Sequence, residues 1–258
     1  MPRAVGDWTR DKLKILEQYL PAYLSATQKA LERIYIDAFA GPGQNLLNKS
    51  DIVIKGSPLI ALEAHGPKGT MFDRLFFIEK DPKAVIELKQ LLRNYDKTGR
   101  AEVIPGDVNK KLPELMHRLS KRSPTFIFID PQGVDPRWTT IEAVVSWRTE
   151  LLINFPLGMS IKRNLTSQKV VGYFGTSEVE ALLSSAQGPR DRSLLDFYKE
   201  RLRRIGYEFQ VEDERLVKTG RNRPLYYLMF VSKVNVGKRI MGAVFDQPDA
   251  AGQARMQI

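Results

Sequence analysis

Acidic residues end two of the apolar segments of the chain, where they could hold a polar ligand. Asp37 ends the first segment and opens a turn that contains Phe39, Gly41 and Gly43, and Glu79 ends the next segment. Carboxylates accept hydrogen bonds from amino and hydroxyl groups, and glycines let backbone amides approach a ligand closely. We therefore expect Asp37 to hold an amine or a hydroxyl group, the amides of the turn to approach the same ligand, and Glu79 to bind the two hydroxyls of a ribose.

A third acidic residue, Asp107, follows the next apolar segment, directly before Val108. Its carboxylate could receive the amino group of an adenine, with Val108 packed on the ring. Taken singly, such acids are also common turn and helix-cap residues. Because ligands of open α/β sheets bind at the carboxyl ends of strands, three acids at successive strand ends indicate one site.

The glycine turn departs from the dinucleotide-binding pattern G-x-G-x-x-G, because Leu46 stands where the third glycine would be. Glu79 also lies farther along the chain than the usual interval of about 20 residues, owing to the segment at 44–56. The missing glycine disfavours a pyrophosphate and favours a nucleoside that carries an amino acid tail. S-adenosylmethionine fits this description, and an NAD- or nucleotide-binding enzyme is the weaker alternative.

Two further polar residues, Asp130 and Asn154, end the fourth and fifth apolar segments. In amino-directed nucleic acid methyltransferases, the position of Asp130 opens the motif Asp/Asn/Ser-Pro-Pro-aromatic, whose oxygens hold the target amine. Asp130 and Pro131 match this motif, whereas Gln132 and Gly133 leave no aromatic platform for a flipped base. We expect Asp130 to orient an acceptor amine or to remove its proton, with Asn154 assisting.

The segments that would position these residues alternate between strand and helix. Nearly continuous apolar runs, typical of strands covered on both faces, occur at 34–39, 75–79, 102–105, 126–130 and 151–155. Helical patterns lie between them at 57–64, 82–92, 111–119 and 140–145. The alternation predicts a doubly wound α/β fold with a parallel sheet.

The two ends of the chain have a different pattern. Residues 8–33 predict a helix that Pro21 interrupts, and an amphipathic helix at 192–204 precedes strands at 207–211 and 225–231. These last strands should be antiparallel neighbours, which completes the seven-stranded, mostly parallel sheet of a Rossmann-like methyltransferase. We divide the chain into an N-terminal helical extension at 1–33, the Rossmann-like domain at 34–245 and a C-terminal tail at 246–258.

The net charge of the chain is +10, from 40 Lys and Arg against 30 Asp and Glu, which suits an anionic partner such as nucleic acid. If the last two strands form a hairpin, their loop lies on the same rim as the ends of the parallel strands. Five cations would then surround the site and could position phosphates: Lys162, Arg163, Lys218, Arg221 and Arg223. A solvated basic rim without a ligand is the alternative.

Composition excludes several kinds of chemistry. The chain has no Cys and only His65 and His117, so disulfides, thiolate metal sites and a Cys nucleophile are excluded, and we expect no metal centre. No signal peptide and no window near 18 apolar residues occurs. We therefore expect a cytoplasmic protein without a membrane segment.

Several motifs together resemble the three-Cys-motif partner proteins. The similarity is carried by Trp8 and the helix at 12–19, by residues 35–43, 56–58 and 128–133, and by the strand at 227–233. The resemblance implies a methyltransferase-like domain of bacteria or their mobile elements, often encoded beside a protein with a three-cysteine motif that would be its partner. It implies no established substrate.

The chain is also similar more widely to S-adenosylmethionine-dependent methyltransferases. This resemblance implies that Asp37, Gly41 and Gly43 embrace the methionine end of the cofactor, that Glu79 binds the ribose, and that Asp107 binds the adenine. Asp130 would face the methyl group. We expect a methyltransferase that acts on a nucleic acid, and the alternative is a methyltransferase-like module that serves a partner protein without catalysis.

Overall fold

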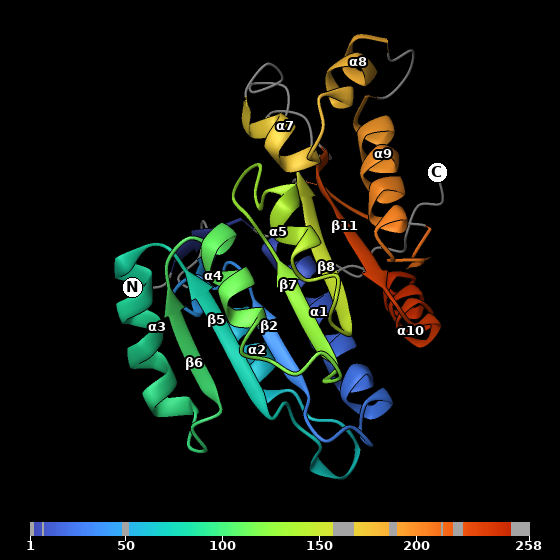
Figure 1. Ribbon diagram of the computed structural model, residues 1–258. Helices are drawn as coiled ribbons and strands as arrows, with labels where there is room; N and C mark the ends of the chain where they lie inside the picture. Colours follow the sequence, from blue (N-terminus) through green and yellow to red (C-terminus); the bar gives the residue numbers. More distant parts are fainter. Residues whose placement is uncertain are drawn as a thin grey trace.

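Five parallel strands form the centre of the structure, and they coincide with the apolar segments of the sequence. The computed structural model describes residues 3–6, 8–47, 52–156, 168–185, 190–212, 214–218 and 224–248. The five strands are β2 (Ile34–Asp37), β5 (Arg74–Glu79), β6 (Ala101–Pro105), β7 (Thr125–Ile129) and β8 (Thr149–Pro156). They pair in the order β6-β5-β2-β7-β8 (Figure 1). The chain thus places β5 and β6 on one side of β2 and then β7 and β8 on the other side. This arrangement confirms the doubly wound prediction.

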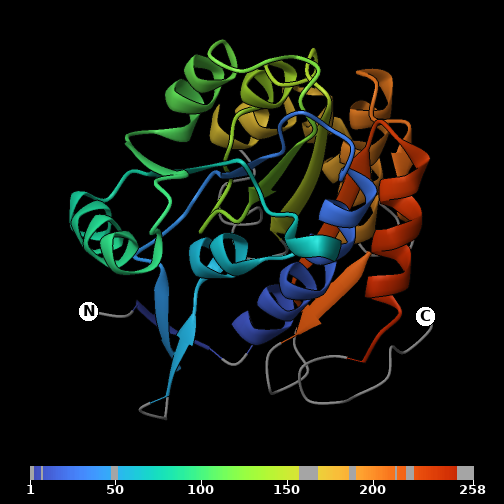
Figure 2. The ribbon, with the colours of Figure 1, turned by 90° about the horizontal axis from the view of Figure 1, so that it is seen from below.

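Helices cover both faces of this sheet, which explains why its strands are apolar almost without interruption. One face is covered by α4 (Val108–Met116), α5 (Trp138–Glu142), α7 (Gln168–Phe174) and α9 (Arg190–Arg204), with α8 (Glu178–Ser185) between the last two. The other face is covered by α1 (Thr9–Ala26), α2 (Ser57–Glu63), α3 (Pro82–Tyr95) and α10 (Asn235–Phe245). Figure 2 shows the sheet between the two layers. Side chains along β2 alternate between the two faces. Ile34 and Ile36 pack on the face covered by α4, α5, α7 and α9, and Tyr35 packs on the face covered by α1, α2, α3 and α10.

The antiparallel end of the sheet differs from the prediction in one detail. β11 (Pro224–Ser232) runs antiparallel beside β8, as expected. Its other edge pairs with two short strands, β9 (Phe209–Gln210) and β10 (Arg215–Lys218). The described part of the sheet therefore has eight strands instead of seven, because the strand expected at 207–211 is continued, after a break, by β10.

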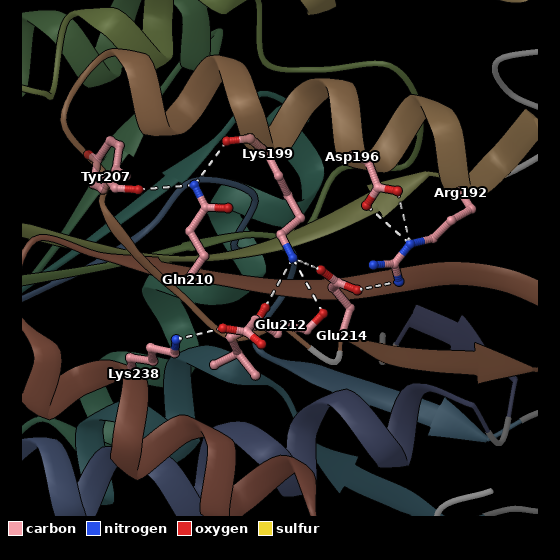
Figure 3. A network of polar contacts seen from close by, with 9 residues as sticks. Arg192, Asp196, Lys199, Tyr207, Gln210, Glu212, Glu214 and Lys238 are labelled. Carbon is pink, nitrogen blue, oxygen red and sulfur yellow. Dashed lines mark hydrogen bonds and ion pairs between the residues drawn. The ribbon is translucent and has the colours of Figure 1, made fainter. Parts of the chain in front are cut away.

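Lys199 of α9 accounts for the break between β9 and β10 (Figure 3). Its ammonium donates to the backbone carbonyl oxygens of Val211 at 3.2 Å and Glu212 at 3.4 Å, and forms an ion pair with Glu214. Arg192 donates to the second carboxylate oxygen of Glu214 at 2.8 Å. Because these carbonyls are bound to α9, the backbone leaves the ladder at this point, and the buried pair fixes the edge of the sheet to the helix.

Helix α1 corrects the expectation that Pro21 interrupts the N-terminal helix. The helix continues through Pro21 and ends at Ala26, so residues 27–33 are not part of it. Leu16, Leu20 and Leu24 are fully buried along one side of α1 and belong to the same core as the strands. This packing outweighs the hydrogen bond that a proline removes from a helix.

A small second sheet was not predicted. It consists of β1 (Arg3–Val5), β3 (Gln44–Leu47) and β4 (Val53–Lys55), in the order β1-β3-β4. Each strand is only three or four residues long, and neither β3 nor β4 buries a full apolar face, so the sequence pattern carried no signal for it. The excursion through β3 and β4 accounts for the long interval between the glycine turn and Glu79.

The predicted division at residues 33 and 245 stays a prediction, and residues 249–258 of the expected tail lie outside the described residues. A short 3-10 helix, Pro67–Gly69, completes the elements between α2 and β5. Within the described ranges, none of the helices is long and apolar enough to span a bilayer.

Candidate functional site

A cavity of about 390 Å³ lies at the carboxyl ends of β2, β7 and β8. It is lined by residues 39–43 after β2, residues 130–132 after β7, and Asn154 near the end of β8. The N-terminal segment, with Trp8 and Lys12, lines the same cavity from another direction. The ends of β2 and β7 flank the point at which the strand order reverses, where ligands of open α/β sheets bind.

The glycine turn after β2 needs glycine at two positions. Gly41 has φ +63° and Gly43 has φ +84°, a backbone conformation that other residues rarely adopt. A Cβ at Gly43 would lie 2.6 Å from a methyl group of Leu91, so this glycine also allows close packing on α3. A Cβ at Gly41 would have no protein atom within 4 Å, so the space beside this residue is unfilled.

Asp37 lies beneath the turn and does not line the cavity, since it is fully buried. Its Oδ1 accepts the N–H of Phe39 at 3.1 Å, and the hydroxyl of Ser57 also bonds to its carboxyl group. Burial raises the pKa of Asp37 to about 7, because the ionised carboxylate is poorly solvated there. Asp37 thus ties the turn to the start of α2, and its contact with a cofactor amine stays a prediction.

Glu79 holds the glycine turn from the side of β5. Its Oε2 accepts the N–H of Gly41 at 2.7 Å, and its Oε1 accepts the N–H of Asp81 at 2.7 Å. The amide of Gly41, which we expected to be available to a ligand, is therefore taken by Glu79. Each carboxylate oxygen retains a second lone pair, so ribose binding by Glu79 stays a prediction.

Asp130 is the centre of a polar cluster on the cavity wall. Its Oδ1 accepts a hydrogen bond from Nδ2 of Asn154 at 2.6 Å, and its Oδ2 is ion-paired with the ammonium of Lys12. The side chains of Lys12 and Asp130 are only 14% and 17% exposed. The two predicted catalytic residues are thus brought into contact, together with a lysine from α1.

Asn154 leaves one polar atom unused. Its Oδ1 is buried and has no hydrogen-bond partner. An unsatisfied buried carbonyl costs about 1–3 kcal/mol, so such an atom needs a specific reason to be retained.

Sequence reasoning missed several residues that line the cavity, among them Lys12, Trp8 and Tyr226. The hydroxyl of Tyr226 donates to the backbone oxygen of Trp8 at 3.3 Å, which joins β11 to the N-terminal segment. The Nζ atom of Lys12 lies 5.9 Å from the centroid of the Tyr226 ring. Trp8 and Lys12 are among the residues that carry the family resemblance. This resemblance was the signal that could have assigned them to the site.

Besides Asp37 and Glu79, two more predicted cofactor residues lie outside the cavity lining. Asp107 caps α4 by accepting the N–H of Asn109 at 2.9 Å and is bound by Lys80 at 2.9 Å. The hydrogen bond from Lys80 lowers the pKa of Asp107 below its usual range. Val108 is 5% exposed and packs in the core. Their roles toward an adenine stay predictions.

The proposed basic rim is described only in part. Lys218 ends strand β10, which corrects its expected place in a loop, and it does not line the cavity. The other four cations, Lys162, Arg163, Arg221 and Arg223, lie outside the described residues. In the part of the chain that the structure describes, no group of three or more His, Asp and Glu side chains is arranged to hold a metal ion.

The cavity fits the methionine end of S-adenosylmethionine on two observations. Gly41 leaves open space that a side chain would fill, and Asp130 lines the same cavity. The acids expected at the ribose and the adenine, Glu79 and Asp107, lie outside this cavity, beside the turn and at the start of α4. Their contacts with the ribose and the adenine of a bound cofactor stay predictions.

Comparison with known proteins supports the fold. No protein-family model matches the chain, and no curated protein matches its sequence. Among solved structures, protein LPL1258 from Legionella pneumophila strain Philadelphia 1 is similar with a TM-score of 0.55, at 14% identity, over 92% of this chain and 90% of that one. An O-methyltransferase from Bacillus cereus, solved in complex with SAH (S-adenosylhomocysteine), has a TM-score of 0.50 at 13% identity, over 86% and 80% of the two chains. The chain therefore has the Rossmann-like fold of S-adenosylmethionine-dependent methyltransferases.

Proposed function

We propose that the protein is an S-adenosylmethionine-dependent methyltransferase that acts on a nucleic acid in the cytoplasm. The observation that carries the proposal is the cavity at the reversal of strand order, which is lined both by the glycine turn and by the Asp130–Asn154 pair. The net charge of +10 supports a polyanionic substrate.

The glycine turn, with Phe39, Gly41 and Gly43, would hold the methionine end of the cofactor, and Asp37 and Glu79 would keep the turn in place. When bound, S-adenosylmethionine supplies an electrophilic methyl group on a good leaving group. Asp130 and Asn154 would then orient the acceptor, since placing the reacting atoms about 3–3.5 Å apart in line supplies much of the acceleration. The cations Lys162, Arg163, Lys218, Arg221 and Arg223 remain the proposed phosphate contacts.

Transfer of tritium from methyl-labelled S-adenosylmethionine to bacterial RNA, to DNA and to protein tests this function. We expect label in a nucleic acid fraction, and a loss of at least about a hundredfold in Asp130→Ala, because removal of an orienting group has effects of this size. The matched control, Asp246→Ala at the end of α10, should retain the activity. Label found only in protein would contradict the proposed substrate.

A second candidate function is a methyltransferase-like module that binds a partner and transfers nothing. One observation favours it: both oxygens of Asp130 are engaged within the protein, by Lys12 and by Asn154. The similarity to three-Cys-motif partner proteins supplies the kind of partner, a protein with a three-cysteine motif. Binding of S-adenosylhomocysteine without transfer to any polymer, together with a stable complex with such a protein, would favour this candidate.

A further inference from the structure

A second cavity, of about 180 Å³, lies at the amino ends of β7 and β8, on the opposite edge of the sheet from the glycine turn. Pro124 precedes β7, and Thr149 and Glu150 begin β8. Helices α1 and α10, which lie side by side (blue and red in Figure 2), supply two of its walls. A cavity of about 150 Å³ can hold one benzene molecule, so this second cavity has room for a small organic molecule.

The walls of the second cavity are mainly apolar and aromatic. Tyr19 and Tyr23 line it from α1, with their ring centroids 6.3 Å apart, and Ile240 lines it from α10. Ala26, Val234 and Val236 complete the apolar part of the lining. Aromatic faces attract both apolar groups and cations, so these walls suit a ligand that combines the two.

Glu150 is the buried acid of the second cavity, with only 8% of the residue exposed. Its Oε2 accepts a hydrogen bond from the hydroxyl of Tyr19. Its Oε1 accepts the hydroxyl of Ser232 at 3.2 Å and would overlap a Cβ atom on Gly237. Both oxygens therefore lie against residues that line the cavity, Tyr19 and Gly237, and each oxygen retains a lone pair.

The charge of Glu150 is not balanced by a cation in contact with it. Its two hydrogen-bond donors are neutral hydroxyls. Burial raises the pKa of Glu150, because the ionised carboxylate is poorly solvated there. Among the described residues, no Lys or Arg side chain forms an ion pair with this carboxylate, although buried charges in proteins are usually paired. A cationic ligand would supply the missing partner.

The two cations of the lining do not fill this role. Lys233 donates its ammonium to the backbone oxygen of Val145, and its Nζ atom lies 5.4 Å from the centroid of the Tyr207 ring. Arg148 is exposed, and its attraction lowers the pKa of Glu150 less than burial raises it. An anionic ligand would gain from Arg148 but would bring a second negative charge toward Glu150. A cation therefore fits the buried end of the cavity better.

We propose that the second cavity binds a small organic ammonium ion, with its charged nitrogen on Glu150 and its apolar body between the tyrosines of α1 and Ile240. The ammonium donates to the free lone pairs of the carboxylate, and the rings of Tyr19 and Tyr23 cover the adjacent carbon atoms. This site is separate from the cavity at the glycine turn. It does not depend on the proposed function and would remain if S-adenosylhomocysteine failed to bind.

Three probes of similar size test the class of ligand. Benzylamine is protonated at pH 7, benzyl alcohol is neutral, and benzoate is anionic. Each is titrated into the full-length ¹⁵N-labelled protein, and the dissociation constant is read from amide chemical shifts, with the largest changes expected at Val236 and Gly237. We expect benzylamine to bind about tenfold tighter or more than benzyl alcohol, because hydrogen bonds from a charged donor to a carboxylate are about twice as strong as neutral ones. Equal binding of amine and alcohol, tighter binding of benzoate, or no binding of any probe would overturn the proposal.

Two variants assign the preference to this cavity. Glu150→Gln keeps the shape and an acceptor for Tyr19 but removes the charge, so the ratio between amine and alcohol should fall toward one. Ala26→Trp, at the exposed end of α1, places a large ring at the cavity wall and should weaken both probes at least about tenfold. If Glu150→Gln does not fold, Ala26→Trp decides, since undiminished binding would place the ligand elsewhere.

Two controls complete the experiment. Glu63→Gln, on α2 and outside the lining of the second cavity, should retain the full ratio between amine and alcohol. Asp130→Asn should also retain it, because Asp130 lines the cavity at the glycine turn. Loss of benzylamine binding in Asp130→Asn would place the amine in that other cavity and overturn the proposal.

Discussion

Lys12 and Asp130 lie 118 residues apart in the sequence and form an ion pair on the wall of the cavity. The pair joins the first helix to the end of β7, next to the bond between Asp130 and Asn154. The N-terminal helix is therefore part of the candidate site as well as of the core.

Loss of the lysine should destabilise the protein, since Lys12→Met leaves the carboxylate of Asp130 largely shielded and without its cation. We expect a decrease of about 1–3 kcal/mol in the free energy of unfolding, between the values for exposed and buried pairs. Urea unfolding of Lys12→Met, Asp130→Asn and the double variant measures the coupling. Fully additive effects would show that the two side chains do not interact in solution.

The stability of the protein should depend on pH through Asp37. Its folded-state pKa is raised to about 7, so the folded state holds this proton over a range in which the unfolded chain has lost it. The contribution of Asp37 to the free energy of unfolding is thus fully present below the unfolded-state pKa of about 4. It decreases by at most about 1.4 kcal/mol per pH unit and is lost as the pH rises to about 7.

Asp37→Asn removes this titration. Measured by urea unfolding between pH 5 and pH 8, the wild type should lose stability relative to Asp37→Asn as the pH rises. Asp107→Asn is the control, because the lowered pKa of Asp107 places its titration below this window. A difference between wild type and Asp37→Asn that stays constant from pH 5 to pH 8 would contradict the raised pKa.

The buried pair of Lys199 and Glu214 should contribute far more to the free energy of unfolding than the exposed pairs of the same helix. The side chain of Glu214 is 0% exposed, so Glu214→Gln leaves the ammonium of Lys199 buried without a counter-ion. We expect a loss of about 3–5 kcal/mol in the free energy of unfolding. Glu200→Gln breaks exposed pairs with Arg203 and Arg204 and should have a much smaller effect. Similar losses in both variants would count against the network of Figure 3.

Glu79 should influence cofactor affinity through the glycine turn. Glu79→Gln replaces one of the two oxygens that accept the N–H groups of Gly41 and Asp81. We expect binding of S-adenosylhomocysteine to weaken about tenfold, the equivalent of one hydrogen bond to a charged group. Glu114→Gln, on the exposed side of α4, is the matched control. Unchanged affinity in Glu79→Gln would remove Glu79 from the site.

The parallel core was predictable from sequence because each strand is a run of apolar residues that must be buried on both faces. The runs ending at Asp37 and Asp130 also identified the strand ends that line the cavity, since the carboxyl ends of parallel strands share one edge of the sheet. Both inferences need only local patterns, and the strand order confirms the first of them.

Contacts between distant segments were not predictable in this way. The pairing of Lys12 with Asp130 depends on how α1 packs across the sheet, and no local pattern encodes that packing. The split between β9 and β10 depends on one buried lysine, Lys199. In the sequence pattern of α9, this lysine looks like an ordinary solvated helix residue. The role of Asp37 in binding the turn, in place of lining the cavity, follows from its complete burial.

The most direct test of the central claim is calorimetric titration of S-adenosylhomocysteine into the wild-type protein and into Gly41→Ala. The account predicts micromolar binding by the wild type and a loss of about tenfold or more in Gly41→Ala, because a methyl group would enter the open space beside the turn and strain a backbone at φ +63°. NAD should give no heat with either protein. A folded wild-type protein that binds NAD but not S-adenosylhomocysteine, or that binds neither, would contradict the assignment of the cavity to a methyl-donor cofactor.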